Sequence, residues 1–286
     1  MSNTIKVVDV LLAIDEVFPF ARAFDGDLVG LLVGDGNAAV SRVLVTLDPG
    51  LAALARAQEL GANLIVSHHP IRFNSFGHYN ISHVAHSYPE RVLAQALSSG
   101  IAIIAAHTNV DVAQMARRYW GDQLKLEHVG PLPGLMTQYG LPGFPVAAEM
   151  SDESNPYGEM WTVSEPCSLD QLAASVAQIS GRAVKVYGDG QSMVQSLATA
   201  TGSGGGRIPE AQVAKVDLLI AGEFGYHAAL AAVESGLSLI EVGHDASELP
   251  LVDMIAAATG LSGDMLQVHK DADLWRSIEA GPSLKS

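Results

Sequence analysis

Short apolar stretches without polar alternation recur along the chain, and each ends at polar residues or at glycine. A strand that is apolar at every position is buried on both faces, as in a parallel sheet between two layers of helices. Segments with helical periodicity separate the stretches and stop at glycines such as Gly61 and Gly100. The pattern predicts strands at residues 42–47, 63–67, 101–106, 216–221 and 237–242, and helices at 51–60, 89–99 and 226–234.

The alternation of strands and helices is interrupted in the middle of the chain. Residues 131–166 are rich in glycine, proline and isolated acids, and they predict a loop-rich segment. A helix after Ser168, its candidate N-cap, and strands at 184–187 and 195–201 then predict a second unit. We therefore expect an α/β fold of two interleaved units with mostly parallel sheets. The first unit would comprise residues 1–128 and 237–286, and the second would comprise residues 129–236.

Composition narrows the class of protein. Of the 286 residues, 48% are apolar and 16% are charged, and no apolar run is long enough to cross a bilayer, so we expect a globular protein without a membrane span. The first residues lack the features of a secretory signal, which favours a cytoplasmic location. The net charge of −15 opposes nucleic-acid binding, because no cluster of Lys and Arg offsets it. The single cysteine, Cys167, is assigned no chemistry.

Three polar clusters directly follow three of the predicted strands. The carboxyl ends of strands in a parallel sheet are where ligands collect, because the loops there are free to carry polar groups. We therefore expect a site at the carboxyl ends of the strands. The clusters are Ser67-His68-His69-Pro70, His107-Thr108-Asn109-Val110-Asp111 and Gly243-His244-Asp245-Ala246-Ser247-Glu248.

The spacing within the clusters favours a site for two metal ions. Adjacent His68 and His69 point to opposite sides of an extended backbone, which suits two ions better than one. His107 and Asp111 are four residues apart and share a face if a helical turn begins there, as do the histidine and glutamate of the third cluster. Imidazole and carboxylate ligands suit divalent Zn, Fe, Mn, Ni or Co. A carboxylate such as Glu248 can bridge two ions roughly 3.5 to 4 Å apart.

Further residues are candidates for binding a substrate or supporting the ligands. In the loop at 202–206, Gly204 and Gly205 could offer backbone N–H groups to a phosphate, with Arg207 as an accessory charge, although a plain tight turn explains the glycines equally well. Glu223 and His227 follow the strand at 216–221. They would either orient ligand histidines or cap the next helix.

The polar loop between the first two clusters carries three more histidines, His78, His83 and His86. No carboxylate before Glu90 completes a metal site there, so we expect these side chains on an exposed face. Basic residues near the predicted loops are few. They are Arg72, Arg182, Lys185 and Arg207.

Several longer segments, spread along nearly the whole chain, form a recognisable set. They are FDGDLVGLLVGD, RVLVTLD, SHHPIRF, HTNVD, TATGSGGGRIPEA and VDLLIAGEFGYHAALAAVESGLSLIEVGH with its sequel DASE. Together they resemble the NIF-three-like, or GTP cyclohydrolase I type 2, family. The resemblance implies a two-part α/β subunit in a toroidal homohexamer with two divalent metal ions in each subunit. It also implies a ligand set of His68, His69, Asp111, His244 and Glu248, with Glu248 as the bridge.

The resemblance suggests a role for His107, and the chain departs from the family's sequence pattern at two places. His107 matches a further histidine of the family's site, either a ligand or an immediate neighbour, and is a candidate for proton transfer. The family usually has Trp-Asp-Asn where this chain has residues 24–27, and a Gly-Gly-Val-Asn-like turn where it has residues 114–117. The implied ligands are unchanged. The departures therefore bear on loops near the pocket and on the identity of the substrate.

From these observations we expect a metal-dependent hydrolase in which two ions lower the pKa of bound water to about 7. If the family name applies, the resulting hydroxide would open the imidazole ring of the purine in GTP and release formate, with His107 or Glu223 moving protons. Two alternatives stay open. One is a metal-dependent phosphoesterase. Ser67 argues against it, because such enzymes have an aspartate at this position. The other is a non-catalytic metal-binding ring that serves as a scaffold or regulatory protein.

Overall fold

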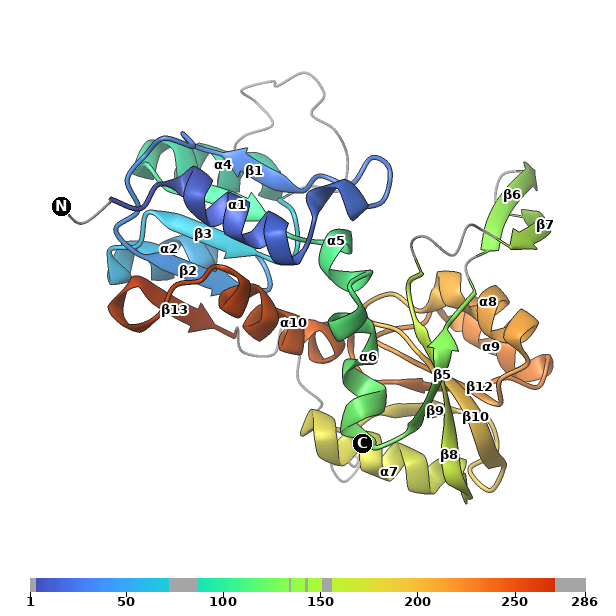
Figure 1. The fold of residues 1–286 in the computed structure, drawn as a ribbon. Coiled ribbons are helices and arrows are strands. Elements are labelled where there is room, and N and C mark those ends of the chain that lie inside the picture. Colours follow the sequence, from blue (N-terminus) through green and yellow to red (C-terminus); the bar gives the residue numbers. More distant parts are fainter. Residues whose placement is uncertain (1–3, 72–86, 134, 142–143, 151–155, 271–286) are drawn as a thin grey trace, which may run out of the picture.

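The chain forms two lobes, each built around a sheet (Figure 1). The computed structural model describes residues 4–71, 87–133, 135–141, 144–150 and 156–270. Helix α6 (Gln114–Gln123) packs on strands of the second lobe, and α10 (His244–Ala258) contacts both α6 and the first sheet. Among the helices in these ranges, none has both the length and the hydropathy needed to cross a bilayer.

The first lobe contains a five-stranded sheet in the order β1-β4-β3-β2-β13. Its strands are β1 (Gly30–Val33), β2 (Val43–Thr46), β3 (Leu64–Ser67), β4 (Ala102–Ala105) and β13 (Leu266–His269). β1 is antiparallel to β4, and every other neighbouring pair is parallel. The helices of this lobe are α1 (Val7–Val17), α2 (Leu51–Leu60) and α4 (Tyr88–Ser99), with the short α5 (Thr108–Asp111) after β4.

Helices cover both faces of the first sheet, which explains why its strands are apolar throughout. Val43 and Val45 of β2 pack in one fully buried cluster with side chains of α1 and α10. Leu44, between them, packs on the opposite face with side chains of α2 and α4. Because side chains alternate along a strand, both faces need apolar residues. The strands predicted at 42–47, 63–67 and 101–106 are thereby confirmed.

The second lobe contains a six-stranded sheet in the order β5-β8-β10-β11-β12-β9. Its strands are β5 (Glu127–Pro131), β8 (Glu159–Ser168), β9 (Lys185–Tyr187), β10 (Met193–Thr199), β11 (Leu218–Ala221) and β12 (Ser238–Glu241). The central β10, β11 and β12 are parallel, and the flanking strands are antiparallel. Side chains of α6 and α7 (Leu169–Ser180) pack on one face, and those of α8 (Ile208–Ala214) and α9 (Tyr226–Glu234) on the other.

Two local predictions are confirmed in this lobe. Ser168 accepts a hydrogen bond from the backbone N–H of Gln171 at 3.3 Å, so it is the N-cap of α7. The helix at 226–234 has the predicted bounds. The α/β class, with two sheets whose parallel strands alternate with helices, is also confirmed.

The segment 131–166 contains more strand than its composition predicts. β8 lies largely within it, as does the hairpin of β6 (Leu135–Leu141) and β7 (Phe144–Met150). β8 pairs with β5 and with β10, so its backbone hydrogen bonds stabilise a strand that has little apolar periodicity. Residues 134, 142–143 and 151–155 of the segment lie outside the described residues.

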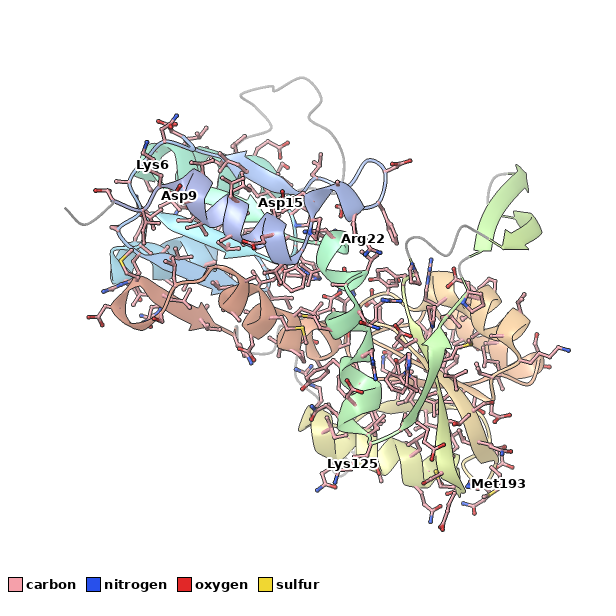
Figure 2. All side chains as sticks on the ribbon, in the orientation of Figure 1. Lys6, Asp9, Asp15, Arg22, Lys125 and Met193 are labelled. Atoms are coloured by element: carbon pink, nitrogen blue, oxygen red, sulfur yellow. The ribbon has the colours of Figure 1, made fainter. Side chains whose placement is uncertain are left out.

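The chain returns to the first lobe later than the boundary expected at residue 237. β12 pairs with β11 and β9 and therefore belongs to the second sheet. The crossing is made by α10, after which β13 pairs with β2. Figure 2 shows Lys6 and Asp9 at the outer end of the first lobe and Lys125 and Met193 at the far end of the second. α10 and the strand ends that precede it lie between these extremes (Figure 1).

Candidate metal centre

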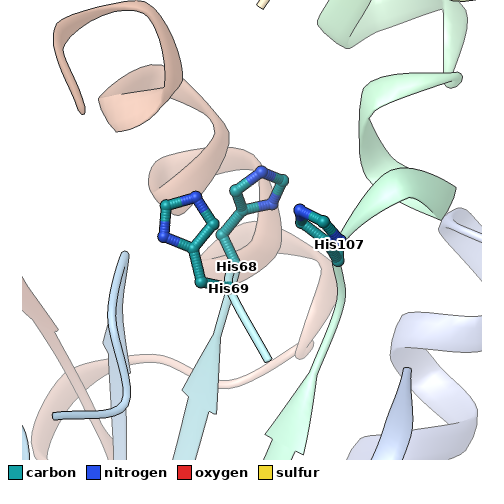
Figure 3. A group of neighbouring side chains, drawn as sticks. All are labelled: His68, His69 and His107. Carbon is teal, nitrogen blue, oxygen red and sulfur yellow. The ribbon is translucent and has the colours of Figure 1, made fainter. Parts of the chain in front are cut away.

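The carboxyl ends of parallel strands from both sheets meet between the lobes. From the first sheet, β3 is followed by His68 and His69, and β4 by His107 and α5. From the second sheet, β12 is followed by α10, whose first turn carries His244. Rings of all these histidines lie within contact range, with centroids 5.2 to 5.8 Å apart in four of the pairs. Figure 3 shows three of the rings gathered beyond the ends of β3 and β4.

The two neighbouring histidines are each held by their Nδ1 atoms. The Nδ1–H of His68 donates to the carbonyl oxygen of Ala106 at 2.9 Å, which leaves Nε2 directed elsewhere. The Nδ1 of His69 lies 2.8 Å from Oδ1 of Asp48, the residue two positions beyond β2. A carbonyl or carboxylate can only accept, so each Nδ1 carries the proton. Both rings therefore present Nε2 as their possible ligand atom.

His107 and His244 have the same arrangement. The Nδ1 of His107 lies 2.9 Å from Oδ2 of Asp27, and the Nδ1 of His244 lies 3.0 Å from Oε1 of Glu223. A histidine that binds a metal almost always donates its other N–H to a carboxylate or carbonyl, which fixes its tautomer and ring orientation. All four histidines meet this requirement.

Glu248 lies at the centre of the cluster. Its Oε2 is 2.9 Å from Nε2 of His69 and 3.2 Å from Nε2 of His244, while its Oε1 is 3.8 Å from Nε2 of His68. On the side of His68, Oδ2 of Asp111 lies 3.6 Å from the same Nε2. The two oxygens of Glu248 thus face two separate groups of ligand atoms.

Two buried atoms of this cluster have no hydrogen-bond partner in the described structure, Nε2 of His68 and Oδ2 of Asp111. Both side chains are fully buried, and a buried polar atom without a partner costs about 1–3 kcal/mol. A divalent cation satisfies both atoms together. The groups that can hold a cation are His68 with Asp111 and Glu248, His69 with His244 and Glu248, and His68 with His69 and His107. This donor set fits the binding of a divalent metal ion.

Positive charge is favoured at His69 and His244. Burial disfavours the charged ring of His69, but hydrogen bonds to Asp48 and Glu248 outweigh burial and raise its pKa to about 10. The hydrogen bond to Glu248 likewise raises the pKa of His244 to about 9. Burial would raise the pKa of Glu248, yet the surrounding histidines hold it well below its usual value. Protons on the histidines therefore occupy the positions that cations would take in a loaded site.

Comparison with known proteins now identifies the family. A model of Duf34/NIF3 (NGG1p interacting factor 3) matches residues 5–265. The chain belongs to the Duf34/NIF3 family. The resemblance found in the sequence motifs is thus confirmed.

Relatives and solved structures match this NIF3 protein over most of its length. The GTP cyclohydrolase 1 type 2 homolog of Streptomyces coelicolor is 28% identical over 262 residues, which cover 88% of this chain and 85% of the relative. The homolog of the same name from Lactococcus lactis is 29% identical over 243 residues, which cover 84% and 86%. A hypothetical protein of Staphylococcus aureus has the same fold, with a TM-score of 0.76 and 24% identity, covering 96% of this chain and 100% of that one.

The glycine-rich loop of the NIF3 protein serves the cluster in a way that its composition did not predict. Gly202 has φ of +55°, and a Cβ on it would overlap Oε1 of Glu248. The loop therefore makes room for the central carboxylate. Of the glycines proposed for phosphate binding, Gly204 already donates its N–H to the carbonyl of Glu223 at 2.9 Å. Gly205 is half-buried, and a Cβ on it would meet no atom within 4 Å. Arg207 is bonded to Glu210 at 2.9 Å and lies beside the cluster.

The fold brings some of the remaining candidate site residues of the NIF3 chain to the cluster and places others away from it. Glu223 reaches the cluster through His244, whereas His227 is exposed on α9 and its ring packs against Tyr226. Among the basic residues, Arg182 pairs with Asp245. Lys185 pairs with Glu241. The predictions for Arg72, His78, His83 and His86 lie outside the described residues.

Sequence reasoning missed three polar residues that hold the cluster. Asp48 could have been found, because it follows β2 as the histidines follow β3 and β4. Thr201, whose hydroxyl donates to Oδ1 of Asp111 at 2.6 Å, follows β10 in the same way. Asp27 had no such signal. It lies in a loop 80 positions before His107 and also accepts hydrogen bonds from the backbone and hydroxyl of Thr108.

In the part of this NIF3 protein that the structure describes, two pockets open on the cluster. One, of about 320 Å³, is lined by His69, His107 and Glu248 together with Phe24, Tyr157 and Arg207. The other, of about 580 Å³, also reaches His69 and His244 but is lined by acidic residues, among them Asp48 and Glu223. The volume of the smaller pocket lies at the lower end of the range of about 300–1,000 Å³ typical of ligand sites.

Proposed function

We propose that this NIF3-family protein is a hydrolase that depends on two divalent metal ions held by His68, His69, Asp111, His244 and Glu248. The observation that carries the proposal is the position of Glu248, whose two oxygens face separate groups of imidazole nitrogens beside a pocket. A carboxylate placed in this way is suited to bridging two ions. Zn, Fe, Mn, Ni and Co all suit the donor set.

Two ions bound there would activate water and polarise the substrate. The protein's own part is to hold the ligand atoms and to position proton-transfer groups. His107 lines the pocket and is anchored through Nδ1 by Asp27, so a proton or an ion would be exchanged at its Nε2. Glu223 lies behind His244 and is a positioning residue, because it accepts the Nδ1–H of that ring.

The finer proposal is a reaction like that of a GTP cyclohydrolase, in which water adds to the imidazole ring of a purine and formate is released. The names of the curated relatives support it. A phosphoesterase is less well supported, because Ser67 stands where an aspartate ligand would be needed. Its hydroxyl is buried and donates to the carbonyl of His69 at 2.7 Å.

We also propose a homohexamer in the cytoplasm. Exposed apolar side chains support self-association, since Tyr226 and Leu230 on α9 are 73% and 46% exposed. Light scattering on the purified protein measures the assembly. A monomer at micromolar concentration would contradict this part of the proposal.

The test is metal analysis followed by a substrate screen with the wild type, Glu248→Gln and the control Glu165→Gln. Glu165 is exposed on β8, away from the cluster, so its variant controls for loss of a carboxylate charge. We expect the wild type and the control to retain about two ions per chain and Glu248→Gln to lose most of them. Formate release from GTP that disappears with Glu248→Gln supports the cyclohydrolase. A fully loaded wild type that hydrolyses neither nucleotides nor phosphoesters would favour a metal-binding scaffold instead.

A further inference from the structure

The 320 Å³ pocket has two walls of different chemistry. One wall is the candidate metal centre, represented by His69, His107 and Glu248. The other consists of Phe24, Tyr157 and Arg207. A ligand in the pocket therefore touches the cluster on one side and aromatic and guanidinium groups on the other.

The aromatic wall is continuous. The rings of Phe24 and Tyr157 have centroids 5.6 Å apart and are tilted by 39°, so they are in contact and leave no room for a third ring between them. A planar ligand would stack on a face that one of these rings turns toward the pocket. Phe24 is 38% exposed although it is a large apolar side chain, which leaves such a face available.

The same hydrogen-bond network fixes the aromatic wall and the cluster. The backbone N–H of Phe24 donates to the hydroxyl of Thr108 at 2.9 Å, and that hydroxyl donates to Asp27 at 2.6 Å. Asp27 in turn holds His107. The distance between the aromatic face and the cluster is therefore set by residues that also orient a candidate ligand.

Arg207 adds one positive charge to this wall. Its guanidinium carbon lies 5.2 Å from the centre of the Tyr157 ring, and Nη1 donates to Glu210 at 2.9 Å. Glu210 is buried, and the Arg207 side chain is only 23% exposed, so the guanidinium is held in place. Guanidinium has five N–H groups, more than one carboxylate can accept, and its planar fork suits a carboxylate or a phosphate oxygen pair.

Away from the candidate metal centre, the charges around the pocket favour a ligand with one anionic group. Apart from the histidines, Arg207 is the cationic residue on the described lining. Arg182 and Lys185 are engaged by Asp245 and Glu241, and Lys185 lines the other pocket. A triphosphate brings several negative charges into a protein whose net charge is −15. If the purine ring of the triphosphate lies at the cluster, the described lining offers its phosphates one guanidinium, that of Arg207.

We propose that this pocket binds a planar heteroaromatic ring with a single anionic group, the ring against Tyr157 and Phe24 and the anion at Arg207. The proposal rests on the proposed hydrolase for the role of the cluster, and it defines the substrate class of that site more narrowly. For the ring-opening reaction proposed above, a heterocyclic acid or a ring with one phosphate is therefore preferred over a nucleoside triphosphate, and GTP is the competing candidate that the test below measures.

The test measures binding to the metal-loaded protein by calorimetry, with nicotinate, its neutral amide nicotinamide, the non-planar cyclohexanecarboxylate, and GTP as probes. Nicotinate cannot chelate an ion through ring nitrogen and carboxylate together, because the two groups are not adjacent. Arg207→Gln should weaken nicotinate about tenfold and leave nicotinamide unchanged, since only the acid uses the charged hydrogen bond. Tyr157→Leu should weaken both planar probes about fivefold or more and leave cyclohexanecarboxylate unchanged.

Arg56→Gln is the matched control. Arg56 bonds to Glu59 three residues later at 2.9 Å, as Arg207 bonds to Glu210, but both side chains of this pair are exposed, at 44% and 65%. It should change the affinity of no probe. The unchanged nicotinamide affinity of Arg207→Gln shows that the variant is folded.

Three results would overturn the pocket proposal. They are no binding of nicotinate at millimolar concentration, an unchanged ratio of nicotinate to nicotinamide affinity in Arg207→Gln, and tighter binding of GTP than of nicotinate. The proposed hydrolase fails separately. Its failure is a metal-loaded protein that binds the ring acid as described but hydrolyses no nucleotide, phosphoester, heterocyclic acid or ester.

Discussion

Gly202→Ala should disable the cluster without unfolding the protein. Gly202 has φ of +55°, in the left-handed region, where an alanine costs roughly 1–2 kcal/mol. The new Cβ would also overlap Oε1 of Glu248, which is 2% exposed and cannot move freely. Overpacking of this kind costs about 1–3 kcal/mol. The sum is about 2–5 kcal/mol, and domains are typically stable by about 5–15 kcal/mol, so most of the protein should stay folded.

The larger effect should be on metal binding. Relief of the overlap displaces Glu248 from Nε2 of His69 and His244, at present 2.9 and 3.2 Å away. Since misplacing even a supporting group of a metal site costs about 10–100-fold in affinity, we expect at least about 100-fold for the central carboxylate. Calorimetric titration of the metal-free protein with Zn²⁺ measures the affinity, and urea unfolding measures the stability.

Gly205→Ala is the control from the same loop. No atom lies within 4 Å of a Cβ on Gly205, so the substitution adds a methyl group in open space. Its stability and its affinity for Zn²⁺ should both equal those of the wild type. Wild-type affinity in Gly202→Ala, or an equal loss in both variants, would refute the role assigned to Gly202.

Three further predictions concern the surroundings of the cluster. Asp48→Asn should lower the affinity for Zn²⁺ about 10–100-fold, because it weakens the bond that orients His69, and calorimetry that shows no change would contradict this role. The pKa values of His69 and His244 in the metal-free protein, about 10 and about 9, lie above the unfolded value of about 6.5. Their contribution to stability is therefore complete below pH 6.5 and is lost as the pH rises through 9 to 10, while the affinity for metal increases over the same window. Urea unfolding of the metal-free protein at pH 6, 8 and 10 checks this, and stability that rises with pH would contradict it. Finally, Arg117→Ala should destabilise the second lobe by about 1–3 kcal/mol in urea unfolding, because it removes the cation 3.0 Å from the buried carboxylate of Glu159 and leaves His128, at 2.8 Å, as its described partner. A loss under 1 kcal/mol would show that the pair is dispensable.

The parts of the fold that follow simple burial rules were predictable from sequence. β2, β3 and β4 are apolar on both faces, so their positions could be recognised, and with them the polar residues at their carboxyl ends. The histidines and Glu248 lie close together because they follow strands whose carboxyl ends meet. β8 could not be recognised in the same way, because its backbone pairing and not an apolar pattern holds it in the sheet.

Residues that depend on long-range contacts were not predictable. Asp27 acquires its role only when a loop near the start of the chain packs against α5. Gly202 was noticed for its composition, but its function depends on a carboxylate 46 positions later. The sheet to which β12 belongs was not predictable either. β12 pairs with β11 and β9, and the apolar pattern of a strand does not specify which strands it pairs with.

Helix α10 gives the candidate centre a mechanical role. Its first turns carry His244 and Glu248 at the edge of one sheet, and its later turns are buried in the core of the other lobe. Ions held between Glu248 and His68 would act as a cross-link between the halves of the molecule. Neither half produced alone would bind them fully, so metal content reports that the two halves have docked.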